Sequence, residues 1–367
     1  MPRGRAIVSR VSDPVSVGDF ERLAEAVLPK GIWDYIAGGA GTETTLAANR
    51  GALDAVTLLP RVLAGAAAAD TRCQLLKTEA NTPVATAPMA YQRLVHPDGE
   101  LALAAAARDA GIPYVASTLS SASIEEIAEV GAATWFQIYW LRERSHVDSL
   151  VARAEEAGAE ALLVTVDVPV VGLRLRDIRN EFTLPEGVEA ANFAGPTRAA
   201  GQQRTVGSSA IAVQTGALFA PALGWQDLEW LRERSPLPLV IKGILDPRDA
   251  VRAVEIGADG VVVSNHGGRQ LDGAAASIAA LPAVVEAVGA HCQVLLDSGI
   301  RSGVDVLRAL ALGAVGVLVG RPLLWGLAVD GAEGAARVLR LLHDELRDAL
   351  TLAGCPDPTV ARTLTVH

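Results

Sequence analysis

Short apolar runs alternate with amphipathic segments from residue 82 to near the end of the chain. Each run ends in polar or glycine residues, and a Gly closes the helical pattern before the next run begins, as in Glu156-Ala-Gly-Ala and Ala311-Leu-Gly-Ala. A Gly at this place supplies the left-handed backbone that ends a helix and turns the chain into a strand. The pattern predicts a repeat of one strand and one helix.

Eight apolar runs are the predicted strands of this repeat. They are Val84–Ala90, Tyr114–Thr118, Trp135–Trp140, Leu162–Val168, Leu239–Ile244, Val261–Ser264, Val294–Asp297 and Val317–Gly320. Eight strands separated by helices favour an α/β fold of the (βα)8 TIM-barrel type, although a doubly wound open sheet fits the same count.

Other segments depart from the repeat. Residues 1–15 are polar and contain two prolines, which predicts a mobile arm. Residues 16–49 have a helical pattern broken at Gly38-Gly39, and residues 50–80 are predicted to be irregular or to form short strands. A long gap, 169–223, follows the fourth strand, and the Gly, Ala, Pro, Gln and Ser content of 186–222 predicts a mobile loop over the active site. No domain boundary is seen, so residues 16–367 are expected to form one domain.

Composition narrows the possible partners. Half of the 367 residues are hydrophobic and only 4% are aromatic, which suits Ala-rich helices packed on parallel strands. The formal net charge of -10 argues against nucleic acid or an anionic membrane as a partner. Cys73, Cys292 and Cys355 lie far apart, which indicates reduced thiols in the cytoplasm. With no cluster of zinc-like spacing, no signal sequence and no span of about 20 apolar residues, we expect a soluble, unprocessed, metal-free protein.

Polar residues follow the predicted strands, where barrels carry their active sites. After the sixth strand, His266 can move a proton near neutral pH and Arg269 can bind a carboxylate bidentately. This pair suits an acid that must lose a proton, whereas a histidine taken alone can also be purely structural. Asp167, after the fourth strand, can hydrogen-bond a histidine and set its tautomer. Tyr139 is a candidate for binding substrate, and Arg174 for closing over its acid group.

Two more strand ends carry charge. Lys242, at the end of the fifth strand, can form a Schiff base, contact an electron-rich cofactor ring or pair with a carboxylate, and its spacing does not distinguish these roles. Asp297-Ser-Gly-Ile-Arg301 and Gly320-Arg321 follow the seventh and eighth strands. They predict a phosphate site, unless their glycines only form tight turns.

Taken together, the segments Ser264–Asp272, Lys242-Gly243 and Asp297–Gly303 resemble the FMN-dependent 2-hydroxy acid oxidase and dehydrogenase family, over residues 18 to 355. Ala87–Gln92 and Thr118–Glu126 are most similar to its bacterial 4-hydroxymandelate oxidase branch. The resemblance implies a barrel that binds FMN and oxidises a 2-hydroxy acid to the 2-oxo acid, with O2 reduced to hydrogen peroxide.

The resemblance also implies roles for individual residues. It makes His266 the base, with Asp167 as its partner and Lys242 beside the flavin ring. The substrate carboxylate and hydroxyl are implied to contact Arg174, Arg269, Tyr35 and Tyr139. The flavin is implied to contact Pro88, Met89, Ala90, Ser117, Gln137, Thr165 and Ser264, and its ribityl chain and phosphate Asp297, Gly299, Arg301, Gly320 and Arg321.

Departures from the family pattern concern the substrate. Leu119 stands where glycolate oxidases have Trp, which implies room for an aryl group, and Ser298 stands where many members have Gly. We therefore expect (S)-mandelate or 4-hydroxymandelate as substrate, with a lactate or glycolate oxidase, a dehydrogenase or a monooxygenase as alternatives. Outside the family, the alternatives are a Schiff-base aldolase that uses Lys242 and a non-catalytic phosphate-binding barrel. Family members are usually homotetramers, so a homo-oligomer is expected.

Overall fold

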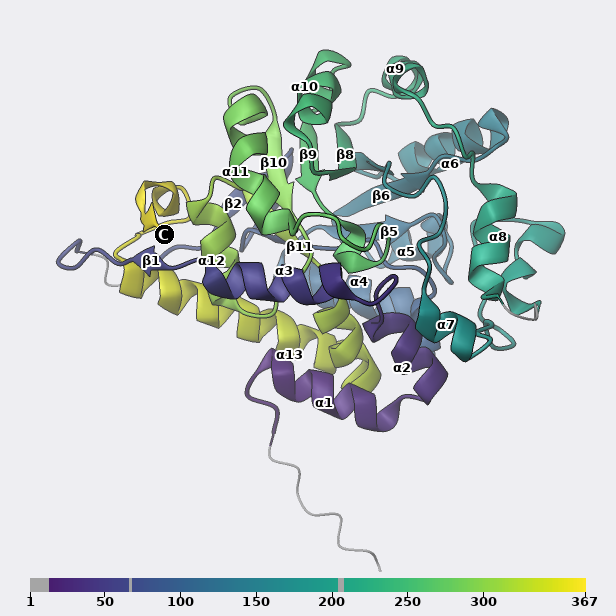
Figure 1. Cartoon of the computed structure of the whole chain (residues 1–367), viewed down its shortest axis with the longest axis horizontal. Helices are drawn as coiled ribbons and strands as arrows, with labels where there is room; N and C mark the ends of the chain where they lie inside the picture. Colours follow the sequence, from purple (N-terminus) through teal and green to yellow (C-terminus); the bar gives the residue numbers. More distant parts are fainter. Residues whose placement is uncertain (1–12, 66–67, 204–207) are drawn as a thin grey trace, which may run out of the picture.

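Eight parallel strands form the centre of the molecule (Figure 1). The computed structural model describes residues 13–65, 68–203 and 208–367, so the arm predicted for residues 1–15 lies almost wholly outside the described residues. The strands are β4 (Val84–Thr86), β5 (Tyr114–Ser117), β6 (Thr134–Tyr139), β7 (Ala161–Thr165), β8 (Leu239–Ile244), β9 (Gly260–Val263), β10 (Gln293–Leu296) and β11 (Gly316–Val319). They match the eight predicted strands to within a few residues at each end.

The sheet closes into a barrel. Its strands pair in the order β4-β11-β10-β9-β8-β7-β6-β5. Hydrogen bonds join the two end strands, because the N–H of Thr86 donates to the carbonyl of Pro113 at 3.0 Å and the N–H of Val115 donates to Thr86 Oγ1 at 2.8 Å. The predicted (βα)8 barrel is confirmed, and the alternative of an open sheet is wrong.

The amino end of the barrel is plugged. Each strand contributes a buried side chain to the interior, and these are Ala85, Val115, Trp135, Leu163, Val240, Val262, Leu295 and Leu318. A hairpin of β2 (Cys73–Leu75) and β3 (Thr78–Ala80) adds Leu75 to this cluster, and Trp135 Nε1 donates to Thr78 Oγ1 at 3.0 Å. The open end is therefore the carboxyl end of the strands, where barrel enzymes bind their ligands.

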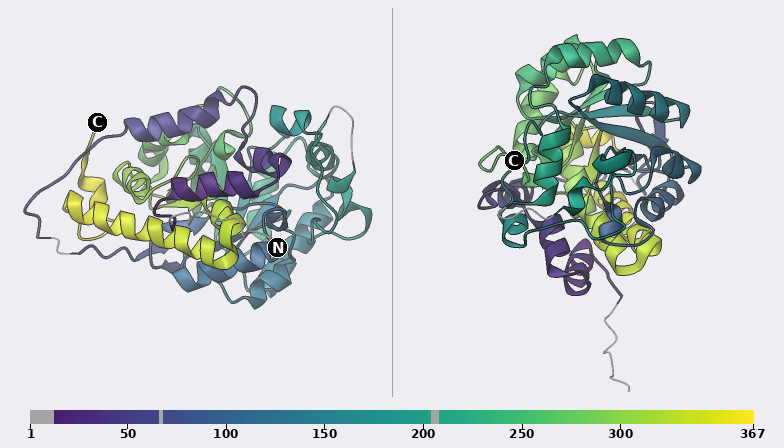
Figure 2. Two further views of the ribbon diagram at one scale, coloured as in Figure 1. Left: turned by 90° about the horizontal axis from the view of Figure 1, so that it is seen from below. Right: turned by 90° about the vertical axis from the view of Figure 1, so that its right-hand side faces the viewer.

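Helices surround the strands and bury their apolar faces against them. They are α4 (Gly99–Ala110), α5 (Ile124–Glu129), α6 (Arg144–Glu156), α9 (Trp225–Arg234), α10 (Pro247–Glu255), α11 (Ser277–Val288), α12 (Gly303–Ala311) and α13 (Arg321–Ala353). The last of these departs from helical backbone at Asp330 and Gly331, and it lies beside α4 and α1 (Val17–Val27), as Figure 2 shows. None of the described helices has the length and apolar character needed to span a bilayer.

The segment before the barrel is helical, as predicted, but extends further. It forms α1, α2 (Lys30–Ala37) and α3 (Thr44–Ala55), with the break between α2 and α3 at Gly38-Gly39. A capping box starts α1, in which Ser16 and Asp19 each accept the other's backbone N–H. The prediction of irregular structure for residues 50–55 was wrong, because Leu53 continues the buried face of α3 that Thr45 and Asn49 begin. A short antiparallel pair, β1 (Leu58–Leu59) with β12 (Thr365–Val366), joins the segment that follows α3 to the C-terminal residues.

The segment after β7 contains more regular structure than its composition predicts. It forms α7 (Leu175–Arg179), α8 (Ala210–Leu218) and two 3-10 turns, Gly195–Thr197 and Ala200–Gln202. Phe182, Val188, Ala190 and Ile211 are buried in the main core and hold the segment against the barrel. Mobility of residues 186–222 stays a prediction.

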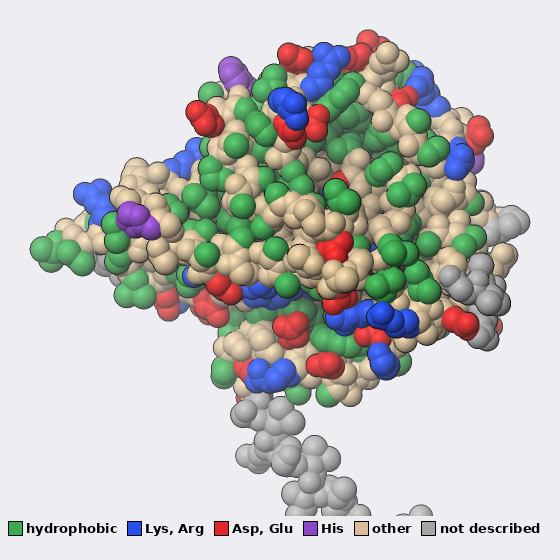
Figure 3. All heavy atoms as spheres, in the orientation of Figure 1, with side chains coloured by type: hydrophobic (Ala, Val, Ile, Leu, Met, Phe, Trp, Pro, Cys, Tyr) green, Lys and Arg blue, Asp and Glu red, His purple; other side chains and the backbone are tan. Residues whose placement is uncertain are grey.

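On the face drawn in Figure 3, acidic and basic side chains are interspersed.

Candidate active site

A cavity with an empty volume of about 1220 Å³, solvent space at its mouth included, opens at the carboxyl end of the strands. Most of the side chains predicted to act on substrate or cofactor line it. They are Tyr35, Pro88, Met89, Ala90, Leu119, Tyr139, Arg174, Lys242, His266, Arg269, Asp297, Gly299, Arg301, Gly320 and Arg321. The barrel thus brings together, at one mouth, residues that lie up to 286 positions apart in the sequence (Tyr35 to Arg321).

His266 and Asp167 form a hydrogen-bonded pair. The two side chains come from the ends of β9 and β7, and His266 Nδ1 lies 2.9 Å from Asp167 Oδ1. Burial lowers the pKa of His266, although Asp167 partly opposes this effect. Burial would raise the pKa of Asp167, but its interactions with His266 and Lys242 outweigh burial, so the pKa of Asp167 is lowered. With Nδ1 donating to the carboxylate, Nε2 of a neutral imidazole is left to accept a proton.

Lys242 is a buried cation with a buried partner. Its Nζ lies 3.0 Å from Asp297 Oδ2 and donates to Ser264 Oγ at 3.0 Å. Burial would lower the pKa of Lys242, but Asp297 and Asp167 outweigh it and raise the pKa. A lysine that stays protonated is a poor nucleophile, so this pairing disfavours the Schiff-base role.

Ser298 joins two of the strand ends. Its backbone has φ 78°, in the left-handed region that favours glycine. Its Oγ donates to Asp297 Oδ1 at 2.7 Å and accepts the N–H of Gly267 at 2.9 Å. The serine therefore links the turn that carries Asp297 to the turn that carries His266.

One end of the cavity has the chemistry of an anion site. Arg301 lies over the ring of Trp325 at 4.7 Å, and Arg321 donates to the carbonyls of Ile36, Gly38 and Gly267 at 2.9–3.0 Å. Neither guanidinium has a carboxylate within ion-pair distance in the described part of the chain. Burial lowers the pKa of Arg301 to about 10 and that of Arg321 further. Two half-buried cations without an anion fit a phosphate group.

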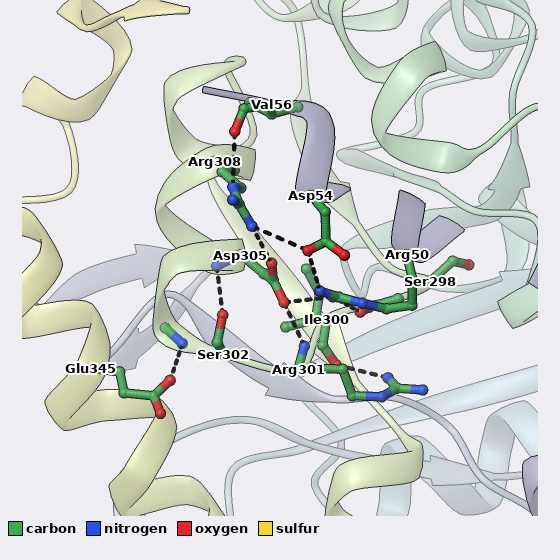
Figure 4. A network of polar contacts seen from close by, with 12 residues as sticks. Arg50, Asp54, Val56, Ser298, Ile300, Arg301, Ser302, Asp305, Arg308 and Glu345 are labelled. Atoms are coloured by element: carbon green, nitrogen blue, oxygen red, sulfur yellow. Dashed lines mark hydrogen bonds and ion pairs between the residues drawn. The ribbon is translucent and has the colours of Figure 1, made fainter. Parts of the chain in front are cut away.

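A network of charged side chains holds the turn that carries Arg301 (Figure 4). Asp305, in the first turn of α12, accepts the N–H of Arg301 at 2.9 Å. The same carboxylate accepts from Arg50 Nη1 at 2.7 Å and from Arg308 Nη1 at 2.9 Å. Ser302 caps the helix by accepting the N–H of Asp305 at 3.1 Å. The anion site is therefore fixed from behind by a buried carboxylate.

A second pair of arginines lies nearer the histidine. Arg269 Nη1 donates to the carbonyls of Tyr35 and Gly38 at 2.7 and 2.8 Å, and burial lowers the pKa of Arg269 to about 10. The buried Nε of Arg174 has no hydrogen-bond partner among the described residues. Burial raises the pKa of Tyr139 to about 12, so its phenol stays protonated and can donate. These groups suit a substrate that carries a carboxylate next to a hydroxyl.

Four residues predicted to contact the flavin are not among the side chains that line the cavity. They lie in the barrel strands or directly after them, and they are Ser117, Gln137, Thr165 and Ser264. Ser117 Oγ donates to Gln137 Oε1, and Gln137 Nε2 donates to Thr165 Oγ1, both at 3.1 Å. These bonds between neighbouring strands support the cavity floor.

One wall of the cavity was missed by the sequence reasoning. Ile211 and Thr215 on α8, and Phe219 just after it, line the cavity. Phe219 also stacks on Tyr139, with ring centroids 4.5 Å apart. The available signal was the spacing of four residues between these side chains, which is typical of one helix face.

Comparison with known proteins gives concordant results. Residues 24–365 match the family model described as FMN-dependent dehydrogenase. The chain is 55% identical to a 4-hydroxymandelate oxidase of Amycolatopsis orientalis, over 95% of this chain and 97% of the relative. It is 48% identical to an L-lactate oxidase of Nostoc sp., over 95% and 96%, and 43% identical to 2-hydroxyacid oxidase 1 of Homo sapiens, over 94% of each. A crystal structure of mandelate oxidase with (S)-4-hydroxymandelic acid superposes with a TM-score of 0.94 at 54% identity, covering 96% of this chain and 99% of that chain.

Proposed function

The chain belongs to the FMN-dependent dehydrogenase family, and from this premise we propose that it oxidises an aryl 2-hydroxy acid to the 2-oxo acid, with O2 as electron acceptor and hydrogen peroxide as second product. The observation that carries the proposal is the meeting, in one cavity, of His266, which Asp167 supports from behind, with Arg174 and Arg269, neither of which has a carboxylate partner among the described residues. If these charged residues had only a structural role, well-packed hydrophobic residues would stabilise the fold at least as well, so the set indicates a functional site.

The residues present fit FMN as the cofactor. Arg301 and Arg321 would hold its phosphate, and the ends of β4 and β8 would border its ring. When bound, FMN supplies the acceptor for two electrons from the substrate. Lys242, which stays protonated beside Asp297, would border the ring and would offset negative charge on the reduced cofactor.

The other side chains bind the substrate and move its proton. Arg174 and Arg269 hold the carboxylate, and Tyr139 donates a hydrogen bond to the substrate oxygen atoms. Nε2 of His266 takes a proton from the substrate, and Asp167 stabilises the imidazolium that forms. His266 therefore acts as the general base of the reaction.

The shape of the cavity supports an aryl substrate over lactate. Leu119, Ile211 and Phe219 give it an apolar wall that a methyl group would not fill. The relatives named above include oxidases of 4-hydroxymandelate and of lactate, so a short aliphatic acid is the second candidate.

The test is the visible spectrum of the purified protein under anaerobic conditions. Addition of (S)-mandelate or (S)-4-hydroxymandelate is expected to bleach the flavin band faster than (S)-lactate at equal concentration. Readmission of air should restore the band and release one equivalent of hydrogen peroxide. Preferential bleaching by lactate would move the substrate to the aliphatic acids, and bleaching without peroxide under air would refute the oxidase.

We also propose that the protein is cytoplasmic and that, as is usual in the family it belongs to, it forms a homotetramer. All three cysteines are free in the described structure, and burial raises the pKa of Cys73 to about 12, so this thiol is unreactive. Sedimentation velocity of the purified flavoprotein should give four times the monomer mass, and a monomer at micromolar concentration would refute the assembly.

A further inference from the structure

Helix α8 presents one polar side chain to the cavity. Ile211 and Thr215 lie one turn apart on the face that lines it, and Phe219 follows at the carboxyl end. Of these three, only Thr215 carries a hydrogen-bonding group. An apolar wall with a single hydroxyl is a common way to select a ligand that is apolar except at one position.

The residues on both sides of Thr215 are fixed by other elements. Tyr91 donates its phenol hydrogen to Gln214 Oε1 at 2.9 Å, and Arg142 Nη2 donates to the carbonyl of Gly216 at 2.8 Å. Beyond the helix, the N–H of Ala220 donates to the carbonyl of Trp140 at 2.9 Å. The position of Thr215 relative to the barrel mouth is thus set from two sides.

The hydroxyl of Thr215 has no hydrogen-bond partner among the described residues, although the residue is only 5% exposed. A threonine within a helix usually donates to the carbonyl one turn earlier, as Thr351 does to Arg347 at 2.8 Å. Thr215 makes no such bond. A hydroxyl that makes no hydrogen bond within the described protein and faces a ligand cavity is suited to bond a ligand.

Topology places this hydroxyl three strands round the barrel from His266 and Arg269, next to the strand that carries Tyr139. His266 and Arg269 follow β9, whereas α8 packs against the end of β6, three strands further round the barrel. In Figure 1, α8 lies on the opposite side of the molecule from α12, the helix that follows Arg301. A substrate that is held by Arg269 and contacts Tyr139 therefore reaches the wall that Phe219 and Thr215 form, because Tyr139 stacks on Phe219.

We propose that Thr215 determines specificity by bonding a hydroxyl on the aryl ring of the substrate, so that the enzyme prefers ring-hydroxylated 2-hydroxy acids such as 4-hydroxymandelate. This inference rests on the proposed function and refines its substrate. The ring packs on Leu119, Ile211 and Phe219, and its hydroxyl supplies the partner that Thr215 lacks. Mandelate fills the same wall but leaves the Thr215 hydroxyl unpaired.

The test compares the two acids with the holoenzyme and its Thr215→Val variant, which has the same shape without the hydroxyl. Anaerobic stopped-flow reduction of the flavin gives a limiting rate and an apparent Kd for each acid. The preference for (S)-4-hydroxymandelate over (S)-mandelate should fall about two- to twelvefold, the worth of one neutral hydrogen bond, and the change should lie in the apparent Kd. Thr215→Ser should keep the preference. Ile211→Val, which trims the same wall without removing a polar group, should change both acids equally.

Equal effects of Thr215→Val on the two acids, or no effect on either, would overturn the inference while leaving the oxidase intact. Failure of both acids to bleach the unaltered enzyme would instead overturn the proposed function. A measurement that needs no variant uses 4-methylmandelate, in which a methyl group replaces the ring hydroxyl. The unaltered enzyme should favour 4-hydroxymandelate over it by a similar factor, and equal kcat/KM values would also overturn the inference.

Discussion

Replacing Asp305 by Asn should destabilise the protein by about 1.5–3 kcal/mol, although the two side chains have the same shape. The carboxylate is fully buried and accepts three hydrogen bonds, two at Oδ2 from Arg50 and the Arg301 N–H, and one at Oδ1 from Arg308. An amide has one oxygen, so at least one donor must face the NH2 group of Asn. A hydrogen bond to a charged group is worth about 1.5–3 kcal/mol, which sets the magnitude.

The assay is urea unfolding at pH 7, followed by circular dichroism, with FMN in fixed excess. Asp54→Asn is the matched control, because Asp54 also pairs with Arg50, at 2.7 Å, but its side chain is 62% exposed. An exposed ion pair contributes about 0–1 kcal/mol, so the control should lose much less stability. FMN affinity, from the quenching of flavin fluorescence, should also fall in Asp305→Asn, because the turn that carries Arg301 loses support. Equal effects of the two substitutions would refute this account of the network.

Three further predictions concern the catalytic end of the cavity. His266→Ala should retain the FMN absorption band but lose flavin reduction by substrate by a factor of about 10²–10⁴ or more, and rapid bleaching in this variant would exclude a general base at this position. Burial lowers the pKa of His266 below its ordinary value of 6.5, and the base must be neutral to accept a proton. The value of kcat/KM should therefore be constant at neutral pH and fall as the pH drops through a midpoint below 6.5. A midpoint above 7 would contradict a neutral imidazole at this site. Arg269→Lys should raise KM about 10- to 150-fold, the worth of a charge-assisted hydrogen bond, with a smaller effect on kcat, and an unchanged KM would place the carboxylate elsewhere.

Strands and charged strand ends were predictable from the sequence because both depend on local patterns. The run Gly260-Val-Val-Val263 can only be a buried strand in a chain of this composition, and His266 must then emerge at its carboxyl end. The wall formed by α8 was not predictable in the same way. Its helix pattern is short and lies in a segment of small and polar residues, and its order comes from long-range bonds such as that of Tyr91 to Gln214.

Ser298 illustrates a second limit of sequence reasoning. The sequence showed only that a serine stands where many family members have glycine, whereas the structure shows that its hydroxyl makes two hydrogen bonds to groups 1 and 31 positions away in the sequence. The pairing of Lys242 with Asp297 could not be predicted for the same reason. The two residues are 55 positions apart in the sequence, and only the closure of the barrel brings their side chains together.

The two half-buried guanidiniums of Arg301 and Arg321 would make a phosphate-bearing cofactor a contributor to the stability of the fold. Without an anion between them, the native state holds two like charges in a poorly solvated place, which the unfolded chain avoids. Any phosphate or sulfate that binds there stabilises the native state by mass action, by about 4 kcal/mol at 1,000 times its Kd. A chain synthesised when flavin is scarce would therefore be less stable, and inorganic anions bound at this place would offset part of the loss until its cofactor arrives.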